Sequence, residues 1–291
     1  MFRLLQIEIY KIFKRPRTYI AFSVITMIIL LLQIALKTGG EEYVGIMMSG
    51  MSEAFNAPPG QILNGYTVCF LILNLLLIHI PILVALIAGD MISGEANMGT
   101  LRLLAAKPVS RIQLLIVKFT AASVYTLMLL IWVAILALGV SVLLFGTNQL
   151  FIARELEVNI IDTGDVLWRY IAAFAFAGVG LIMVAALAFM LSTFFDNSIV
   201  PIVCTVCVII VFTIFSQIEV PLYNAIEPYL FTTHMLGWKG LFYVKGSEGV
   251  TIEGSIENLP AVLRSACVLV GYTGLFLFIG GWYFKRKNIL S

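Results

Sequence analysis

Six long apolar runs follow one another along the chain, separated by shorter polar stretches. An α-helix rises about 1.5 Å per residue, so about 20 apolar residues cross the roughly 30 Å hydrocarbon core of a membrane. Each run is close to that length or longer. The pattern therefore predicts a single all-α polytopic domain over residues 1–291 with six transmembrane helices. Their expected bounds are 18–36, 66–88, 119–145, 166–191, 199–218 and 261–284.

The segment before the first run, residues 1–17, has a different pattern. Apolar side chains recur at helical spacing on one face and basic side chains lie opposite, which is typical of an amphipathic helix in the membrane interface. Because proline interrupts an α-helix, we expect the chain to turn into the bilayer at Pro16. The apolar positions are Phe2, Leu5, Ile9, Ile12 and Phe13, and the basic ones are Lys11, Lys14 and Arg15.

Basic residues are shared unevenly between the two sides that these spans define. The side that carries both termini holds 12 of the 18 lysines and arginines and 4 of the 16 acids, and the opposite side holds 6 and 12. Cytoplasmic loops carry an excess of lysine and arginine. Both termini are therefore predicted to be cytoplasmic.

Composition narrows the function classes. Of the 291 residues 61% are hydrophobic and 12% are charged, and the mean hydropathy is +1.03, whereas soluble domains carry about 25% charged residues. A net charge of +2 offers no basic field for nucleic acid. The sequence contains no P-loop, no H-E-x-x-H and no G-x-S-x-G with a usable base, so neither ATP binding through a P-loop nor metal- or triad-dependent hydrolysis is expected. We predict a protein that is not an enzyme and that needs no cofactor.

The loop at residues 90–118, on the predicted cytoplasmic side, carries the most informative pattern. Ser93 followed by Glu95 indicates the start of a helix with an acid in its first turn, and Pro108 is expected to end it. Ser110 is a suitable cap for the helix that follows. We expect a short helix over residues 93–104 that lies across the membrane surface and docks a cytosolic partner.

This loop resembles the cytoplasmic loop between spans two and three of ABC-2-type transporter permeases. In that family an acid precedes Gly-Thr, a leucine, a proline, a Ser-Arg or Ser-Lys pair and a basic residue that enters span three. The span number, the leading amphipathic helix and an enlarged external segment before span six also match. The residues in these places are Glu95, Gly99, Thr100, Leu101, Leu104, Pro108, Ser110, Arg111 and Lys118.

The resemblance implies a permease subunit of an ATP-driven exporter in the bacterial inner (cytoplasmic) membrane. Its expected partners are two cytosolic ATPase subunits, a second permease copy or close relative, and membrane lipid, with room for an additional extracytoplasmic partner. The loop is then the element that seats in a groove of the ATPase, with Glu95 paired to a group there. The expected coupling residues are Glu95, Gly99, Thr100, Leu101, Leu104, Pro108 and Arg111.

Two polar side chains inside the second predicted span are candidate contacts of a translocation path. Asn74 and His79 are five residues apart, which places them about 140° apart around a helix. Polar groups at membrane depth usually face the bundle interior or a water-lined cavity. The competing interpretation, which we weight more heavily, is interhelical hydrogen bonding that fixes packing. Pro81 is expected to kink the same span.

Sulfur-bearing residues and the segment before the last span leave further alternatives open. Cys204 and Cys207 form a C-x-x-C in an apolar run, where packing is the simpler interpretation. Met47, Met48 and Met51 on the external side match Cu(I) chemistry only weakly. The segment 219–260 is interpreted as an external helix or re-entrant element that acts as a gate or as a simple lid. The alternative functions are a self-contained secondary transporter and a metal- or copper-related membrane protein without an ATPase partner.

Overall fold

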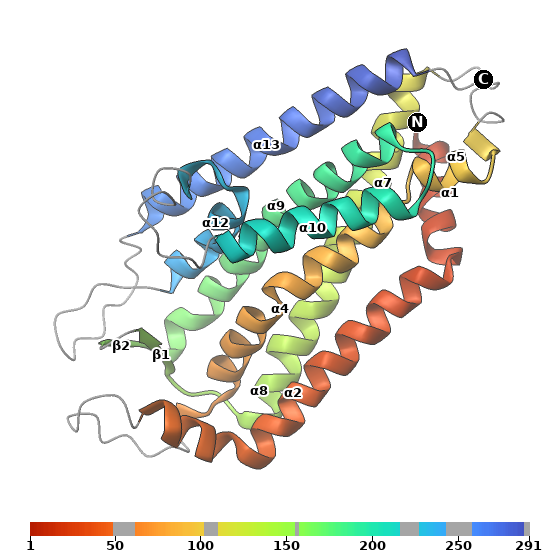
Figure 1. The fold of residues 1–291 in the computed structure, drawn as a ribbon. Coiled ribbons are helices and arrows are strands. Elements are labelled where there is room, and N and C mark those ends of the chain that lie inside the picture. The colour runs from red at the N-terminus through yellow and green to blue at the C-terminus, as the bar shows by residue number, and fades with distance from the viewer. Residues whose placement is uncertain (49–61, 102–109, 155–156, 216–226, 243–257, 288–291) are drawn as a thin grey trace.

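The computed structural model describes residues 1–48, 62–101, 110–154, 157–215, 227–242 and 258–287. Apolar helices run side by side in one elongated bundle (Figure 1). The starts of α1 and α7, the helix α5 and the end of α13 lie at one end of this bundle, here called the network end. The strands and α12 lie at the other, called the hairpin end.

The long helices overlap the predicted apolar runs, and α2 continues well past the predicted bound at residue 36. They are α2 (Pro16–Met48), α4 (Gly65–Ala88), α7 (Arg111–Ala134), α9 (Thr163–Phe194), α10 (Ile199–Phe215) and α13 (Leu259–Arg286). A π-helical stretch, η1 (Ile135–Val140), and α8 (Ser141–Phe145) continue α7 without a break, so that Arg111–Phe145 forms one helical rod of 35 residues.

Four of the described helices are long and apolar enough to cross a membrane: Pro16–Gly40, Arg111–Phe145, Thr163–Phe194 and Leu259–Arg286. The helix α4 makes a fifth if its two halves, Gly65–Leu76 and Ile78–Ala88, are taken as one span bent by 52°. The bend falls four residues before Pro81, where the missing N–H of proline leaves a carbonyl unbonded, and the predicted kink is confirmed. The remaining apolar helix, α10, has 17 residues.

The N-terminal helix α1 (Phe2–Lys14) ends where the sequence predicts. Arg15 adopts an extended conformation, with φ −83° and ψ 133°, and α2 begins at Pro16. Proline suits the first helical position because the N–H it lacks would have no partner there. Ile12 is buried, and Leu5 and Ile9 pack against the core, whereas Phe2 is exposed, so only part of the predicted apolar face contacts the bundle.

The helix α9 forms the centre of the bundle and packs against α4, α7, α10 and α13. Small residues on its surface let neighbouring helices approach closely. A Cβ on Gly178 would lie in ordinary contact with leucine side chains of α7, and one on Gly180 would contact Met235 and Leu269. The buried small residues of α9 include Ala173, Gly178, Gly180, Ala185, Ala186 and Ala188.

The structure adds one element that the apolar runs do not predict. Strands β1 (Leu150–Arg154) and β2 (Glu157–Ile161) pair antiparallel, with Leu150 opposite Ile161 and Arg154 opposite Glu157. Leu150, Ile152 and Ile161 are buried. Each strand has five residues, too few for an alternating pattern to stand out beside long apolar helices, so the expectation of an all-α chain is incomplete at this point.

A buried glutamine holds α2 against the π-helical stretch. Gln33 Nε2 donates to the carbonyl of Leu136 and to Ser141 Oγ, both at 2.9 Å. A π-helical segment changes the backbone hydrogen-bond register, and Leu136 lies within it. Gln33 therefore ties α2 to the point where the long rod is irregular.

The first residue of α4 packs directly on the backbone of α8. A Cβ on Gly65 would lie 2.5 Å from Val142 Cα and 2.7 Å from the carbonyl oxygen of Ser141. These neighbours are backbone atoms, so only a shift of one helix against the other relieves the overlap.

We expect Gly65→Ala to destabilise the protein by about 1–3 kcal/mol, the usual cost of overpacking, measured as a lower thermal unfolding temperature in detergent. The control is Gly139→Ala, because a Cβ there would meet nothing within 4 Å. Equal unfolding temperatures for the two variants would contradict this helix contact.

Candidate functional site

At the network end of the bundle, the turn from α4 to α5 (Ser93–Asn97) is fixed to the central helix. The backbone N–H groups of Ile92 and Ser93 both donate to Ser192 Oγ on α9, at 3.1 and 2.9 Å. Ser93 Oγ donates to the carbonyl of Gly89 at 2.7 Å. Ser192 and Ser93 are fully buried. The turn is therefore attached rigidly to α9 and is not a free loop.

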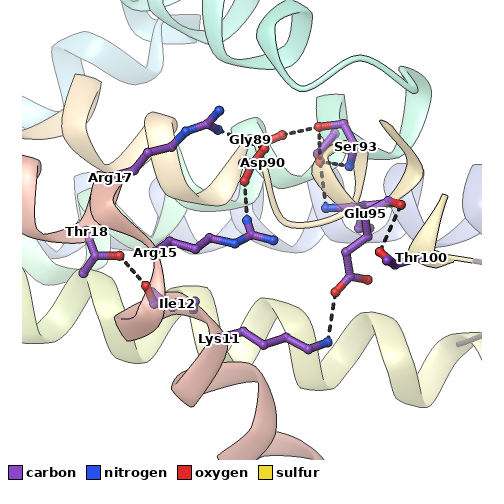
Figure 2. A network of polar contacts seen from close by, with 12 residues as sticks. Lys11, Ile12, Arg15, Arg17, Thr18, Gly89, Asp90, Ser93, Glu95 and Thr100 are labelled. Carbon is purple, nitrogen blue, oxygen red and sulfur yellow. Dashed lines mark hydrogen bonds and ion pairs between the residues drawn. The ribbon is translucent and has the colours of Figure 1, made fainter. Parts of the chain in front are cut away.

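Asp90 joins this turn to the junction between α1 and α2. Its carboxylate pairs with the guanidinium groups of Arg15 and Arg17, the latter at 3.1 Å (Figure 2). Thr18 Oγ1 donates to the carbonyl of Ile12 at 2.5 Å and stabilises the junction itself. Both arginines come from the break at Pro16, so the break places two cations beside the end of α4.

A second set of charges joins α1, α5 and α7. Lys118 Nζ on α7 lies 2.8 Å from Glu8 Oε2 on α1 and 2.8 Å from Glu95 Oε1 on α5. Lys11 Nζ lies 2.7 Å from Glu8 Oε1 and 3.1 Å from Glu95 Oε1. We call these four residues the charge network. Two carboxylates balance two ammonium groups, so the network is neutral.

Three of the four residues of the network are buried, whereas the side chain of Lys11 is 35% exposed. Lys118, Glu95 and Glu8 are 1%, 3% and 5% exposed. Burial raises the pKa of Glu8, but the ammonium groups of Lys118 and Lys11 outweigh burial and hold it below its ordinary value of 4.5. Burial lowers the pKa of Lys11, but the hydrogen bond that Lys11 donates to Glu8 and the charge of Glu95 more than offset this effect and raise the pKa above its ordinary value. Because the pKa of Glu8 is lowered and that of Lys11 is raised, these two side chains are charged at neutral pH.

The structure places Glu95 differently from the sequence expectation. The carboxylate faces inward to Lys118 and Lys11, because α7 and α1 supply the cations that were expected from a partner. The helix predicted over residues 93–104 is interrupted: α5 covers Ser93–Asn97, and Gly99, at φ +71°, turns the chain. A left-handed conformation of this kind favours glycine. Helical backbone resumes at Thr100 and Leu101, and residues 102–104 lie outside the described residues.

Of the other predicted coupling residues, two follow Gly99 directly, one lies at the start of α7, and two are not described by the structure. Thr100 is exposed and its hydroxyl donates to the carbonyl of Glu95 at 3.2 Å, whereas Leu101 is buried. Arg111 lies beside the end of α13. Leu104 and Pro108 lie outside the described residues. The capping role of Ser110 is confirmed, because it forms a capping box with Gln113 at the start of α7.

The candidate path residues Asn74 and His79 are not brought together. Asn74 Nδ2 donates to the carbonyl of Phe70, and the ring Nδ1 of His79 lies 2.9 Å from the carbonyl of Leu75, so each bonds within its own helix. Asn74 is half-buried, and His79 is exposed on the outer surface of the chain. A cavity of about 50 Å³ lies at the bend of α4, and neither residue lines it.

The described part of the chain contains no candidate metal site. No group of three His, Cys, Asp or Glu side chains there is arranged to hold a metal ion. Cys204 is half-buried and Cys207 is exposed on α10. The side chains of Met47 and Met48, and the whole of Met51, lie outside the description.

Part of the segment 219–260 covers the hairpin end of the bundle. It contains the short helices η2 (Glu227–Tyr229), α12 (Phe231–Met235) and η3 (Leu236–Leu241). Arg169 on α9 is fully buried, pairs with Asp165 at 2.9 Å and donates to the carbonyl of Leu241 at 2.6 Å. Trp238 and Phe242 pack on Phe70 of α4, each at 5.5 Å between ring centroids. Through these contacts, η3 and Phe242 are held against α9 and α4 at the hairpin end.

The sequence reasoning missed Glu8, Asp90 and Gln33. Glu8 is the only acid in residues 1–17 and stands one turn from Ile12 on the apolar face of α1, a pattern that indicates a buried partner. Gln33 is a polar residue inside an apolar run, which carries the same signal. Their partners on other elements lie between 73 and 110 positions away in the chain, so no local pattern identifies them.

The fold and this site define a polytopic helical membrane protein with a buried charge network at one end. The chain belongs to a family described as a protein of unknown function (DUF2705), whose model matches residues 23–290. It is also similar to the uncharacterized protein YhcI of Bacillus subtilis (strain 168), with 30% identity over 121 residues. That match covers 39% of this chain and 37% of the relative.

Removing Lys118 tests the charge network. We expect Lys118→Met to destabilise the folded protein by about 3–5 kcal/mol, because it leaves two buried carboxylates with one ammonium group. The double variant Lys118→Met/Glu8→Gln restores one carboxylate to one ammonium group and should recover most of that loss. Thermal unfolding in detergent measures both. A double variant as unstable as the single one would contradict charge balance as the cause.

Proposed function

We propose that the chain is the membrane-spanning subunit of an ATP-driven transporter of the ABC-2 type, acting as an exporter. The supporting observation is the segment made of the turn after α4 and the helix α5, which is joined to three other helices and is followed by exposed residues. Ser192 joins it to α9, Lys118 to α7, and Lys11 to α1. A force applied to this segment from outside the membrane is therefore passed to the bundle.

The proposed docking surface is the exposed stretch Asn97–Thr100. Met98 is 60% exposed and Gly99 has nothing within 4 Å of the position of a Cβ, so a partner can approach closely there. Glu95 lies directly behind this stretch as a positioning residue, because its carboxylate connects α5 to α7. In this proposal the ATPase contacts Met98 and its neighbours. The charge network then transmits the movement of the ATPase to α7 and α1.

The assembly follows from the same proposal. In this proposal the chain crosses the membrane six times, with both termini and the docking surface in the cytoplasm, and the excess of basic residues on that side supports the orientation. Two permease chains, identical or closely related, form the translocation pathway, and two separate ATPase subunits supply the energy, since the sequence of this chain has no P-loop.

The docking surface predicts the effect of a charge at Met98. We expect Met98→Asp to reduce the amount of P-loop ATPase that co-purifies with the tagged chain by about tenfold or more, equivalent to about 1.4 kcal/mol. An unpaired carboxylate in a contact surface costs binding free energy. The control, Met98→Leu, retains an apolar side chain and should retain the ATPase. Unchanged recovery with Met98→Asp would contradict docking here, and a wild-type chain that recovers no P-loop ATPase would favour a self-contained transporter.

Sidedness is tested by labelling single cysteines in a variant that lacks the four native ones. Asn148 and Ser110 are both exposed and lie before β1 and at the start of α7. We expect a cysteine at Asn148 to react with an impermeant thiol reagent in intact cells, and one at Ser110 to react only after permeabilisation. Labelling of Ser110 in intact cells would overturn the orientation.

A further inference from the structure

An apolar groove runs between the start of α7 and the end of α13, close to the network end of the bundle. Its volume is about 510 Å³, within the roughly 300–1,000 Å³ of sites that hold small molecules. Leu115 and Phe284 are buried at its base, and Phe278 is 72% exposed at its edge. The lining residues are Arg111, Ile112, Leu115, Ile116, Phe119, Leu277, Phe278, Gly281, Trp282, Phe284 and Lys285.

One end of this groove is cationic. Arg111 reaches across from α7 and donates through Nη1 to the carbonyls of Lys285 and Lys287, at 3.2 and 2.7 Å. Lys285 lines the groove beside it, and the guanidinium carbon of Arg286 lies 4.2 Å from the ring centroid of Trp282. Lys287 is already engaged, because its Nζ pairs with Asp196 at 2.7 Å. None of the lining residues is acidic.

We propose that this groove binds an anionic phospholipid, with an acyl chain against its apolar wall and the phosphate on Arg111, Lys285 and Arg286. The groove is formed by two helices that are long and apolar enough to span a membrane, so its apolar wall is expected to face lipid. Cations and a tryptophan together at the end of a span match the headgroup level of a bilayer.

The charge of the groove favours a lipid over a second copy of this chain. A two-fold contact centred on the groove would bring three cations of one copy toward the same three of the other, and like charges in an interface oppose association. An anionic headgroup instead neutralises them. The same lipid would connect α7 to α13 at the end where Arg111 already bridges them. This inference does not depend on the proposed transport function.

The experiment measures quenching of Trp282 by brominated lipids. The full chain is reconstituted in phosphatidylcholine vesicles that contain a small fraction of dibrominated phosphatidylglycerol or, for comparison, dibrominated phosphatidylcholine. The signal of Trp282 is the difference between the wild-type chain and Trp282→Phe. We expect half-maximal quenching at about a tenfold lower fraction of the anionic lipid than of the zwitterionic one, because each cation near the headgroups adds to the attraction.

Variants separate a built site from general surface charge. Lys285→Gln/Arg286→Gln should bring the two quenching curves together, whereas Arg3→Gln, which removes an exposed cation on α1 at the same end, should leave the anionic preference unchanged. Equal quenching of the wild-type chain by both lipids would overturn the proposal, whether or not the double variant folds. So would a preference that survives in the folded double variant, or a groove that is quenched by neither lipid because a second copy covers it.

Discussion

The ammonium group of Lys118 constrains the whole network end of the bundle. A cation that is 1% exposed costs several kcal/mol to desolvate, and only paired charges with hydrogen bonds compensate that cost. Glu8 and Glu95 supply the compensation from two different elements, each at 2.8 Å. The helix α1 must therefore lie against α7, and the turn after α4 must fold back onto the same place. One buried charge thus fixes the relative positions of three segments that are far apart in the sequence.

Polar anchors at other positions hold the rest of the bundle in a similar way. Gln33 attaches α2 to the π-helical stretch, and Ser192 attaches the turn after α4 to α9. At the hairpin end, Arg169 holds η3 through the carbonyl of Leu241. In hydrocarbon the apolar surfaces of helices gain little from contacting each other instead of lipid, so packing and hydrogen bonds of this kind select the arrangement.

The same anchors give a physical basis for coupling. Met98 is exposed, while Glu95 and Ser93 close to it are bonded to α7 and α9, so a displacement at Met98 would act on both helices through these contacts. In the proposed transporter, the docking contact and the transmission of force belong to different residues. The exposed stretch contacts the partner, and the charge network connects that stretch to the membrane helices. From the sequence motif alone, both the contact with the ATPase and the transmission of force are assigned to Glu95.

Much of the architecture could be predicted from the sequence because it depends on neighbouring residues. The apolar runs determine where the long helices lie, Pro16 determines where α1 ends, Pro81 bends α4, and Ser110 caps α7. Each of these follows from hydrophobicity or backbone chemistry within a few positions. The partner of Glu95, the role of Glu8, the bond from Gln33 and the groove beside Arg111 were decided only by the tertiary structure. Most of these contacts join residues from 84 to 176 positions apart, and even Lys118, 23 positions from Glu95, lies on a different helix. A local pattern shows that a group is polar but not which group on another element will neutralise it.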